Sequence, residues 1–219
     1  MVHPLRSTVE DFIAGLKAFE HEVITQPLVR DYMASMPLSA DALKPYLHFN
    51  DFYYTRNLIY RDKLFDVMVI CWKPGRKTAI HTHNGQLGWM HVPQGEVAIH
   101  NYHYQSCDHP ERQNVVGIDC LAGATHIDLD RLQTDVCHDQ SGIALVDKQH
   151  TIHQIENMDS AKSGAISLHL YSLPFDSCVA FDLENQRCFR RTLNFYSRYG
   201  KVELEAEQKQ PGGSFHIIA

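Results

Sequence analysis

Apolar residues in the first 50 positions recur at the spacing of helices. One helix face follows the i, i+3, i+4, i+7 pattern and consists of Val9, Phe12, Ile13 and Leu16. Ser7 and Glu10 have the spacing of a capping box that would begin this helix. A second, less regular face lies in residues 29–33, and Ser39 is placed to cap a third helix. The pattern therefore predicts a helical segment over residues 1–50.

From residue 51 to 200, short apolar runs alternate with turn residues. Seven such runs, rich in Val, Ile, Leu, Tyr and Phe, lie at 53–60, 65–72, 95–104, 123–130, 142–147, 164–172 and 190–197. Many short strands at this spacing are typical of a β-sandwich or a small β-barrel. We therefore expect a mainly β, jelly-roll-like barrel after the helices. Residues 1–219 would form a single domain that ends in a tail at 201–219.

Composition and charge narrow the possible partners. Lys and Arg number 20 and Asp and Glu number 26, so the net charge of −6 argues against a nucleic-acid partner. No apolar run reaches the ~18 residues that a membrane span needs. The N-terminus MVHPLRSTVEDF lacks the apolar core of a secretion signal, and the six cysteines have no paired spacing. We therefore expect free thiols and a cytoplasmic location.

Two histidines, His81 and His83, lie two residues apart. If residues 79–83 form a strand, both imidazoles point to one face and can chelate one metal ion. The spacing H-x-H alone is more often a polar strand face. Here, however, it lies within G-x5-H-x-H-x4-E-x6-G, which fits from Gly75 to Gly95 with Gly88 at the Glu position.

A second pattern, G-x5-P-x-G-x2-H-x3-N, fits from Gly142 through His153 to Asn157, with Lys148 and His150 replacing the Pro and the second Gly. These patterns resemble the two motifs of the cupin family, a small β-barrel that carries its metal inside. The third ligand would be His153. His150, three residues away, would face the other side of a strand, and the spacing to Asn157 favours His153.

Three neutral imidazoles and no carboxylate leave the charge of a divalent ion uncompensated. Such a site favours an anionic substrate as a further ligand. Iron oxygenase sites usually contain two His and a carboxylate, and zinc is the chemical alternative. The ligand type alone does not distinguish Fe(II) from zinc.

The strand predicted at 164–172 has two different faces. Its even-numbered residues from 166 to 170 are apolar and point into a packed core. Ser167, His169 and Tyr171 point the other way, and these three side chains can form one hydrogen-bonded chain. The alternative interpretation is a polar strand face in contact with solvent.

Several runs together resemble the cysteine dioxygenase family, over nearly the whole chain. They are YTRNL (54–58), CW (71–72), H-x-H (81–83), HQIEN (153–157), SLHLYSLPFDSC (167–178) and FYSRYG (195–200). The resemblance implies that Fe(II) is bound by His81, His83 and His153. It also implies that Arg56 binds the substrate carboxylate and that Tyr54 lines the same pocket. Tyr171 would be the active-site phenol, oriented by His169 and Ser167.

The implied substrates are L-cysteine, bound as a thiolate, and O2, both of whose atoms end on sulfur to give a sulfinic acid. Relatives that act on 3-mercaptopropionate tend to have Gln where this chain has Arg56, so Arg56 favours cysteine. Two alternatives of other classes are a metal-binding cupin sensor without chemistry and a zinc hydrolase. The sequence does not indicate the oligomeric state.

Three positions depart from the family pattern. Animal members carry a cysteine at the position of Gly88 that forms a thioether with the tyrosine. We therefore expect an uncrosslinked Tyr171, as in bacterial-type members. The family often has a cis proline at the position of Leu173, and because a cis bond before a non-proline residue costs about 2.5–4 kcal/mol we expect a trans bond here. Leu193 replaces a family methionine.

Overall fold

The computed structural model describes residues 7–108, 126–148, 150–158 and 160–203. Its order is α1 (Val9–Leu16), η1 (His21–Val23), α2 (Gln26–Ser35), α3 (Ala40–Leu43), η2 (Lys44–Tyr46), β1 (Thr55–Arg61), β2 (Asp66–Trp72), β3 (Arg76–Lys77), β4 (Ile80–His81), β5 (Leu87–Gln94), β6 (Glu96–Cys107), β7 (Ile127–His138), β8 (Ala144–Val146), β9 (Ile152–Asn157), β10 (Ala165–Ser172), β11 (Ser177–Asp182), β12 (Arg187–Thr192), β13 (Ser197–Arg198) and β14 (Lys201–Val202). Most of the predicted tail lies outside the described residues.

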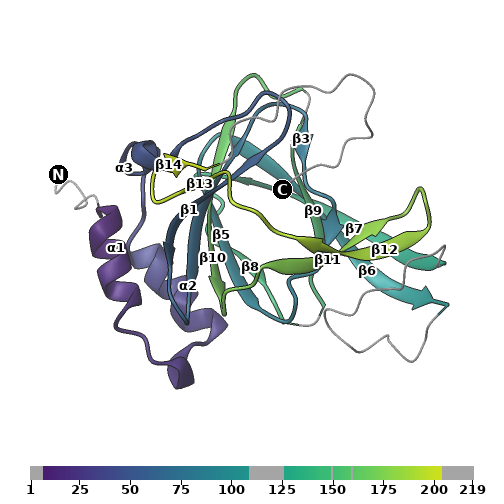
Figure 1. The fold of residues 1–219 in the computed structure, drawn as a ribbon, viewed down its shortest axis with the longest axis horizontal. Helices are drawn as coiled ribbons and strands as arrows, with labels where there is room; N and C mark the ends of the chain where they lie inside the picture. Colours follow the sequence, from purple (N-terminus) through teal and green to yellow (C-terminus); the bar gives the residue numbers. More distant parts are fainter. Residues whose placement is uncertain (1–6, 109–125, 149, 159, 204–219) are drawn as a thin grey trace.

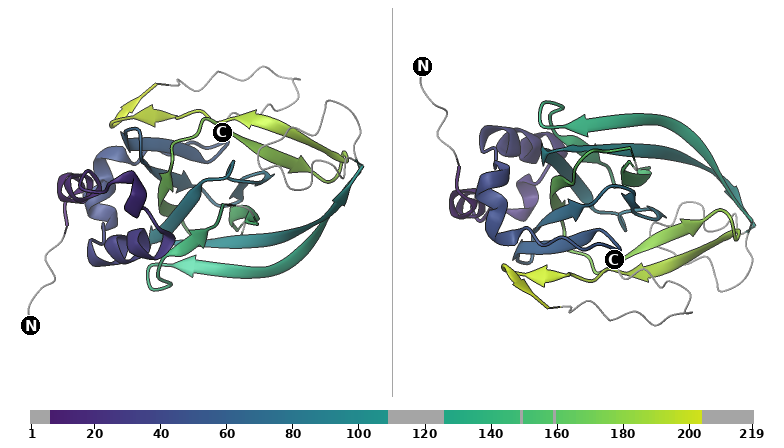
Figure 2. Two further views of the ribbon diagram at one scale, coloured as in Figure 1. Left: turned by 90° about the horizontal axis from the view of Figure 1, so that it is seen from below. Right: turned by 90° about the horizontal axis from the view of Figure 1, so that it is seen from above.

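The strands form two sheets (Figures 1 and 2). The first sheet has the order β14-β13-β1-β2-β10-β5-β8. The second has the order β12-β11-β4-β9-β6-β7, and β3 also pairs with β9. The prediction of a mainly β, jelly-roll-like fold is confirmed, and the strands form two separate sheets rather than one closed barrel.

The helices cover the outer face of the first sheet, on the side opposite to the β6–β7 and β11–β12 hairpins (Figure 1). Phe12 and Leu16 of α1 and Val29 of α2 are buried in one cluster with Leu168 and Leu170 of β10. The predicted apolar helix faces are therefore the faces that pack on the sheet. Among the described helices, none is long and apolar enough to cross a membrane.

The predicted start of the first helix is wrong by one residue. Thr8, not Ser7, is the N-cap, because its side chain accepts a hydrogen bond from the Asp11 amide, and the Asp11 carboxylate accepts one from the Thr8 amide. The Ser7 hydroxyl instead donates to the sulfur of Met36. The third helix ends at Leu43 and continues as the short 3-10 turn η2.

Five strands were not predicted: β3, β5, β9, β11 and β14. The predicted strand at 190–197 is interrupted, since its residues divide between β12 and β13. β4 is only two residues long, so His83 follows the strand rather than lying within it. Short strands of this kind depend on partners far along the chain, which local periodicity does not reveal.

Asn157 joins the two sheets. This buried residue of β9, in the second sheet, donates from its amide to the carbonyls of Trp72 (β2, first sheet) and Ser163. Its own carbonyl accepts from the Gly75 amide at 2.7 Å. The asparagine of the second sequence pattern therefore has a structural contact that holds β9 against the first sheet.

The described cysteines include one that is disulfide-bonded. Cys71, Cys137 and Cys178 are free thiols, but Cys188 is disulfide-bonded, so the expectation of free thiols is wrong for Cys188. That expectation used spacing along the chain, whereas a disulfide depends on proximity in space.

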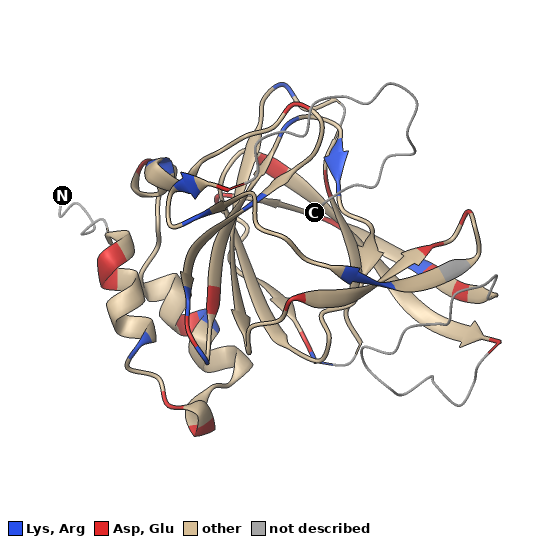
Figure 3. Cartoon of the chain, in the orientation of Figure 1, with Lys and Arg blue, Asp and Glu red and all other residues tan. Residues whose placement is uncertain are grey.

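Acidic and basic residues are interspersed over the described part of the chain (Figure 3).

Candidate metal centre and its cavity

Three histidines, two on neighbouring strands and one just after the first of these strands, meet inside the molecule. His81 on β4 and His153 on β9 are directly opposite each other in the antiparallel ladder, and His83 follows two residues after His81. Their ring centroids are 4.6–4.9 Å apart. Their ligand nitrogens all lie within 4.8 Å of one another, so the predicted trio forms one group. His150, the competing residue, is exposed and lies before β9.

The nitrogen atoms of this group fit a metal ion. His81 donates from Nδ1 to the Ala79 carbonyl at 2.9 Å, which leaves its Nε2 lone pair available. The Nε2 atoms of His83 and His153 are buried and have no hydrogen-bond partner within the described structure. Buried polar atoms are normally paired, so these nitrogens indicate a missing ligand. Three imidazoles suit Fe(II) or zinc.

Burial keeps these histidines in the neutral form that binds metal. It lowers the pKa of His81 to about 4, because the ring is enclosed even though part of the residue is accessible. Burial also lowers the pKa of His83 and His153 well below the usual value, and the neighbouring histidines lower it further. No proton has to leave these rings near neutral pH before a cation binds.

A hydrogen-bonded chain runs along the inner face of β10. Trp72 Nε1 donates to Ser167 Oγ at 2.8 Å, Ser167 Oγ lies 2.8 Å from His169 Nε2, and His169 Nδ1 lies 3.2 Å from the Tyr171 hydroxyl. The predicted chain Ser167–His169–Tyr171 therefore exists, and all three residues are buried. Trp72 at its inner end was not among the predicted site residues.

Trp72 favours one direction in this chain. An indole nitrogen only donates, so Ser167 accepts from it and can give its own proton to His169 Nε2. In that tautomer the Nδ1 proton of His169 points to the oxygen of Tyr171. Each donor before Tyr171 then has an acceptor, and the Tyr171 proton is left for the cavity.

Burial also controls the protonation of His169 and Tyr171. It lowers the pKa of His169 to about 3, with a further contribution from the charge on Arg56. It raises the pKa of Tyr171 above its usual value, against the opposing effect of Arg56. At neutral pH the imidazole is neutral and the phenol keeps its proton.

A cavity of about 50 Å³, here called the front cavity, opens beside the histidines. Its lining includes Tyr54, Arg56, His81, His83, Tyr171 and Arg191. Tyr54 stacks on Trp72 with ring centroids 4.9 Å apart, and Arg56, two residues later, points to the same side. Thr55 and Asn57 point the other way: Thr55 Oγ1 donates to the His48 carbonyl, and Asn57 Oδ1 accepts from Ser197.

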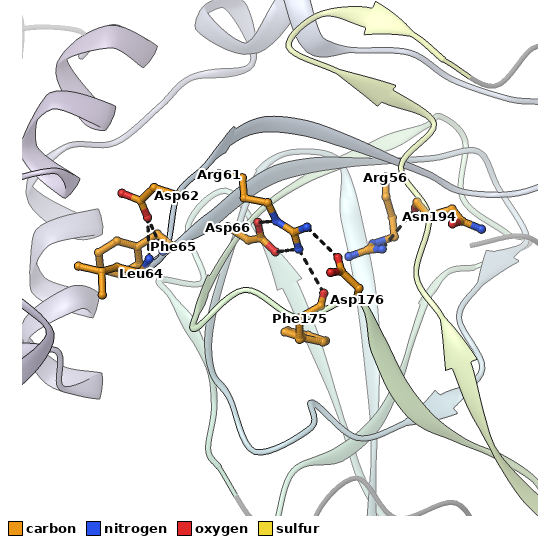
Figure 4. A network of polar contacts seen from close by, with 9 residues as sticks. All are labelled: Arg56, Arg61, Asp62, Leu64, Phe65, Asp66, Phe175, Asp176 and Asn194. Atoms are coloured by element: carbon orange, nitrogen blue, oxygen red, sulfur yellow. Dashed lines mark hydrogen bonds and ion pairs between the residues drawn. The ribbon is translucent and has the colours of Figure 1, made fainter.

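Arg56 is a buried cation without an acidic partner among the described residues. Its Nη1 donates to the Asn194 carbonyl at 3.3 Å, and its guanidinium lies 4.8 Å from the centre of the Phe195 ring. The nearby acids are held elsewhere, since Arg61 donates to both oxygens of Asp66 and to Asp176 (Figure 4). Most of the Arg56 donors therefore remain for an anion.

The site predicted from the sequence did not include Arg191 or Cys178. Both line the front cavity, and they are cross-strand partners on β11 and β12. Arg191 adds a second positive charge beside Tyr54 and His81. Burial raises the pKa of Cys178 to about 11, so its thiol stays protonated. No signal in the sequence separated Arg191 from its neighbour Arg190.

The departures from the family pattern lie beside Tyr171. Gly88 of β5 pairs with Tyr171, and a Cβ at Gly88 would lie 2.9 Å from the phenol ring. The expected trans bond between Ser172 and Leu173 is wrong, because this bond is cis. In this arrangement the Leu173 amide donates to Gln86 Oε1 at 2.7 Å, a partner that the sequence did not reveal. Leu193 lines the front cavity.

Known proteins resemble this chain over most of its length. The family model described as cysteine dioxygenase type I matches residues 3–184. Cysteine dioxygenase type 1 of Danio rerio is 28% identical over 207 residues, covering 92% of this chain and 94% of the relative. The protein of the same name from Rattus norvegicus is 29% identical over 156 residues, covering 71% and 68%.

A crystal structure from Ralstonia eutropha, of a protein of unknown function with a cupin-like fold, overlaps with a TM-score of 0.36. It is 13% identical and covers 63% of this chain and 65% of the other. The match to the family model spans most of the sequence, and the chain belongs to the cysteine dioxygenase type I family.

Replacing His153 tests the metal centre. We expect His153→Ala to lower the affinity for Fe(II) or zinc by roughly 100-fold or more, since changes to the partners of ligands alone cost 10–100-fold. His150→Ala, three residues away and exposed, is the matched control and should bind normally. Calorimetry on metal-free protein measures both. Equal affinity in the two variants would exclude His153 as a ligand.

Proposed function

We propose that this member of the cysteine dioxygenase family is a thiol dioxygenase that converts L-cysteine and O2 to cysteine sulfinic acid, with Fe(II) held by His81, His83 and His153. The observation that carries the proposal is the pairing of two features in one cavity. Three imidazoles form one group, in which His83 and His153 have buried unpartnered nitrogens. Two of this group, His81 and His83, line the front cavity together with Arg56, a buried arginine that has no acidic partner among the described residues. A thiol that carries a carboxylate complements both.

The ligand set explains the need for a thiolate. Three neutral imidazoles contribute no negative charge, so an anionic ligand is favoured at a divalent ion bound there. When bound, Fe(II) supplies stabilisation of the thiolate and the electrons that activate O2. The protein fixes the positions of the histidines through β4 and β9, and it keeps their rings neutral.

Arg56 binds and orients the substrate. A guanidinium can hold a carboxylate with two parallel hydrogen bonds, which fixes the direction as well as the distance of the bound molecule. Burial lowers the pKa of Arg56, but the group remains charged. Tyr54, packed on Trp72, provides a rigid wall of the same pocket. The thiol end is thereby directed to the histidines.

Tyr171 holds a proton at the reacting end of the cavity. Its phenol ring lies 6.0 Å from the ring of His83, centre to centre, and its hydroxyl oxygen accepts from His169. Burial keeps the proton on the phenol, so Tyr171 can donate a hydrogen bond to oxygen or to thiolate as negative charge develops. Ser167 and Trp72 act through His169 and are positioning residues.

A second candidate substrate is 3-mercaptopropionate. No carboxylate lines the described part of the front cavity, so the protein offers no counter-ion for the ammonium group of cysteine. 3-Mercaptopropionate lacks that group and keeps the carboxylate that Arg56 would bind. Arg56 itself favours cysteine through the family resemblance, and we place cysteine first. A passive metal-binding protein has no evident use for the Tyr171 chain.

Oxygen uptake on iron-loaded protein tests the proposed function. We expect one O2 consumed for each thiol, with both oxygen atoms in the sulfinate product when ¹⁸O2 is supplied. L-cysteine should give the higher kcat/KM of the two thiols, and the zinc-loaded protein, which cannot supply electrons, should take up no oxygen. A clear preference for 3-mercaptopropionate would show that this thiol, and not cysteine, is the substrate. No uptake with either thiol would reject the dioxygenase.

Removing the charge of Arg56 should weaken the binding of carboxylate thiols. We expect Arg56→Gln to raise KM for L-cysteine by roughly 10–100-fold, because hydrogen bonds to charged groups contribute about 1.5–3 kcal/mol. Cysteamine, which has no carboxylate, should be turned over equally by both proteins. The exposed Arg30→Gln is the control for loss of one positive charge. Equal losses for cysteine and cysteamine would contradict carboxylate recognition.

Removing the Tyr171 hydroxyl should slow the reaction and leave binding intact. We expect Tyr171→Phe to lower kcat by roughly 100-fold, the usual contribution of one positioned proton donor. KM for the thiol should change little, since the Tyr171 hydroxyl acts at the reacting end of the substrate and Arg56 binds its carboxylate. Tyr199→Phe, at a residue that is 59% exposed, serves as the control. An unchanged kcat would remove Tyr171 from the mechanism.

A further inference from the structure

A second cavity, here called the rear cavity, lies between the two sheets and reaches the same centre. It has a volume of about 270 Å³ and is formed by β5, β8 and β10 on one side and β6, β7 and β9 on the other. Its inner end includes His153, His169 and Tyr171. The front cavity includes His81 and His83 instead of His153, and it shares His169 and Tyr171. The two cavities therefore meet at the phenol from different directions.

The walls of the rear cavity near the centre are apolar and buried. They include Met90, Ile99, Val146 and Ile155, none of which is more than 6% exposed. Apolar cavities of this kind hold small uncharged molecules, and even a cavity of about 150 Å³ lined by apolar side chains binds xenon. The inner end is thus suited to a small apolar ligand.

The outer end of the rear cavity carries the opposite charge to the front cavity. Asp135 is exposed and accepts from Asn101 at 2.8 Å, and both residues line the cavity. A carboxylate there disfavours the entry of an anionic thiol acid, whereas Arg56 and Arg191 favour it in the front cavity. Charge separates the two cavities, and a neutral molecule passes Asp135 without the repulsion that an anion meets.

We propose that the rear cavity is the entry route and holding site of dioxygen, separate from the entry of the thiol. The proposal rests on the dioxygenase function above. The front cavity is small, so a bound thiol acid fills it and closes that approach. The rear cavity still gives a small apolar molecule access to the side of the centre formed by His153 and Tyr171.

Filling the rear cavity tests this route. Ala144 on β8 pairs with Met90 and lines the cavity. We expect Ala144→Phe to raise KM for O2 by roughly tenfold while KM for the thiol and kcat at saturating O2 stay unchanged. Ala144→Val should give a smaller shift in the same direction. The matched control is Val136→Phe, because Val136 is 50% exposed and lies between two lining residues without lining the cavity itself.

Xenon provides a readout that needs no turnover. In crystals of metal-free protein under xenon pressure, we expect a xenon atom between Met90, Ile99 and Val146, and we expect its loss in Ala144→Phe. An absence of xenon from the unaltered protein overturns the holding site. An unchanged KM for O2 in an active Ala144→Phe variant that has lost xenon overturns the route alone. No oxygen uptake by the unaltered iron-loaded protein instead rejects the proposed function itself.

Discussion

The alternation of side chains along β10 is the constraint on which the rest of the molecule depends. β10 lies between β2 and β5 in the first sheet, and every one of its residues is buried. One face supplies leucines and an isoleucine to the core beneath the helices, and the other carries Ser167, His169 and Tyr171. A slip of one residue would exchange these faces. The helices, by burying the apolar face, therefore also hold the polar chain in place.

The two arginines near the centre, Arg61 and Arg56, differ in whether they bind a carboxylate of the protein. Arg61 binds Asp66 through both carboxylate oxygens and also holds Asp176, so these acids are neutralised beside the cavity. Arg56 is left with a carbonyl and an aromatic ring. Since uncompensated buried charge is costly, the interior favours an anion near Arg56 and a cation among the three histidines.

Local periodicity predicted much of the site and less of its surroundings. The polar face of β10 and the choice of His153 both follow from spacing within a few residues, and the structure brings these residues together. The contact of Trp72 with Ser167 depends on β2 pairing with β10, and the position of Arg191 depends on the β11–β12 hairpin. Such pairings are set by contacts distant in sequence. The hydrogen bond from the Leu173 amide to Gln86 likewise joins residues distant in sequence, and local spacing did not reveal it.

Gly88 has a consequence for how the phenol is oriented. Tyr171 packs on that side against bare backbone, where even one additional carbon atom would come within 2.9 Å of the ring. A covalent or bulky neighbour at this position would restrict the ring by steric contact. In this chain the ring is held by noncovalent contacts alone: it packs against Phe175 and His83, and its hydroxyl is hydrogen-bonded to His169. Because noncovalent contacts loosen as thermal motion increases, the orientation of the phenol should be sensitive to temperature.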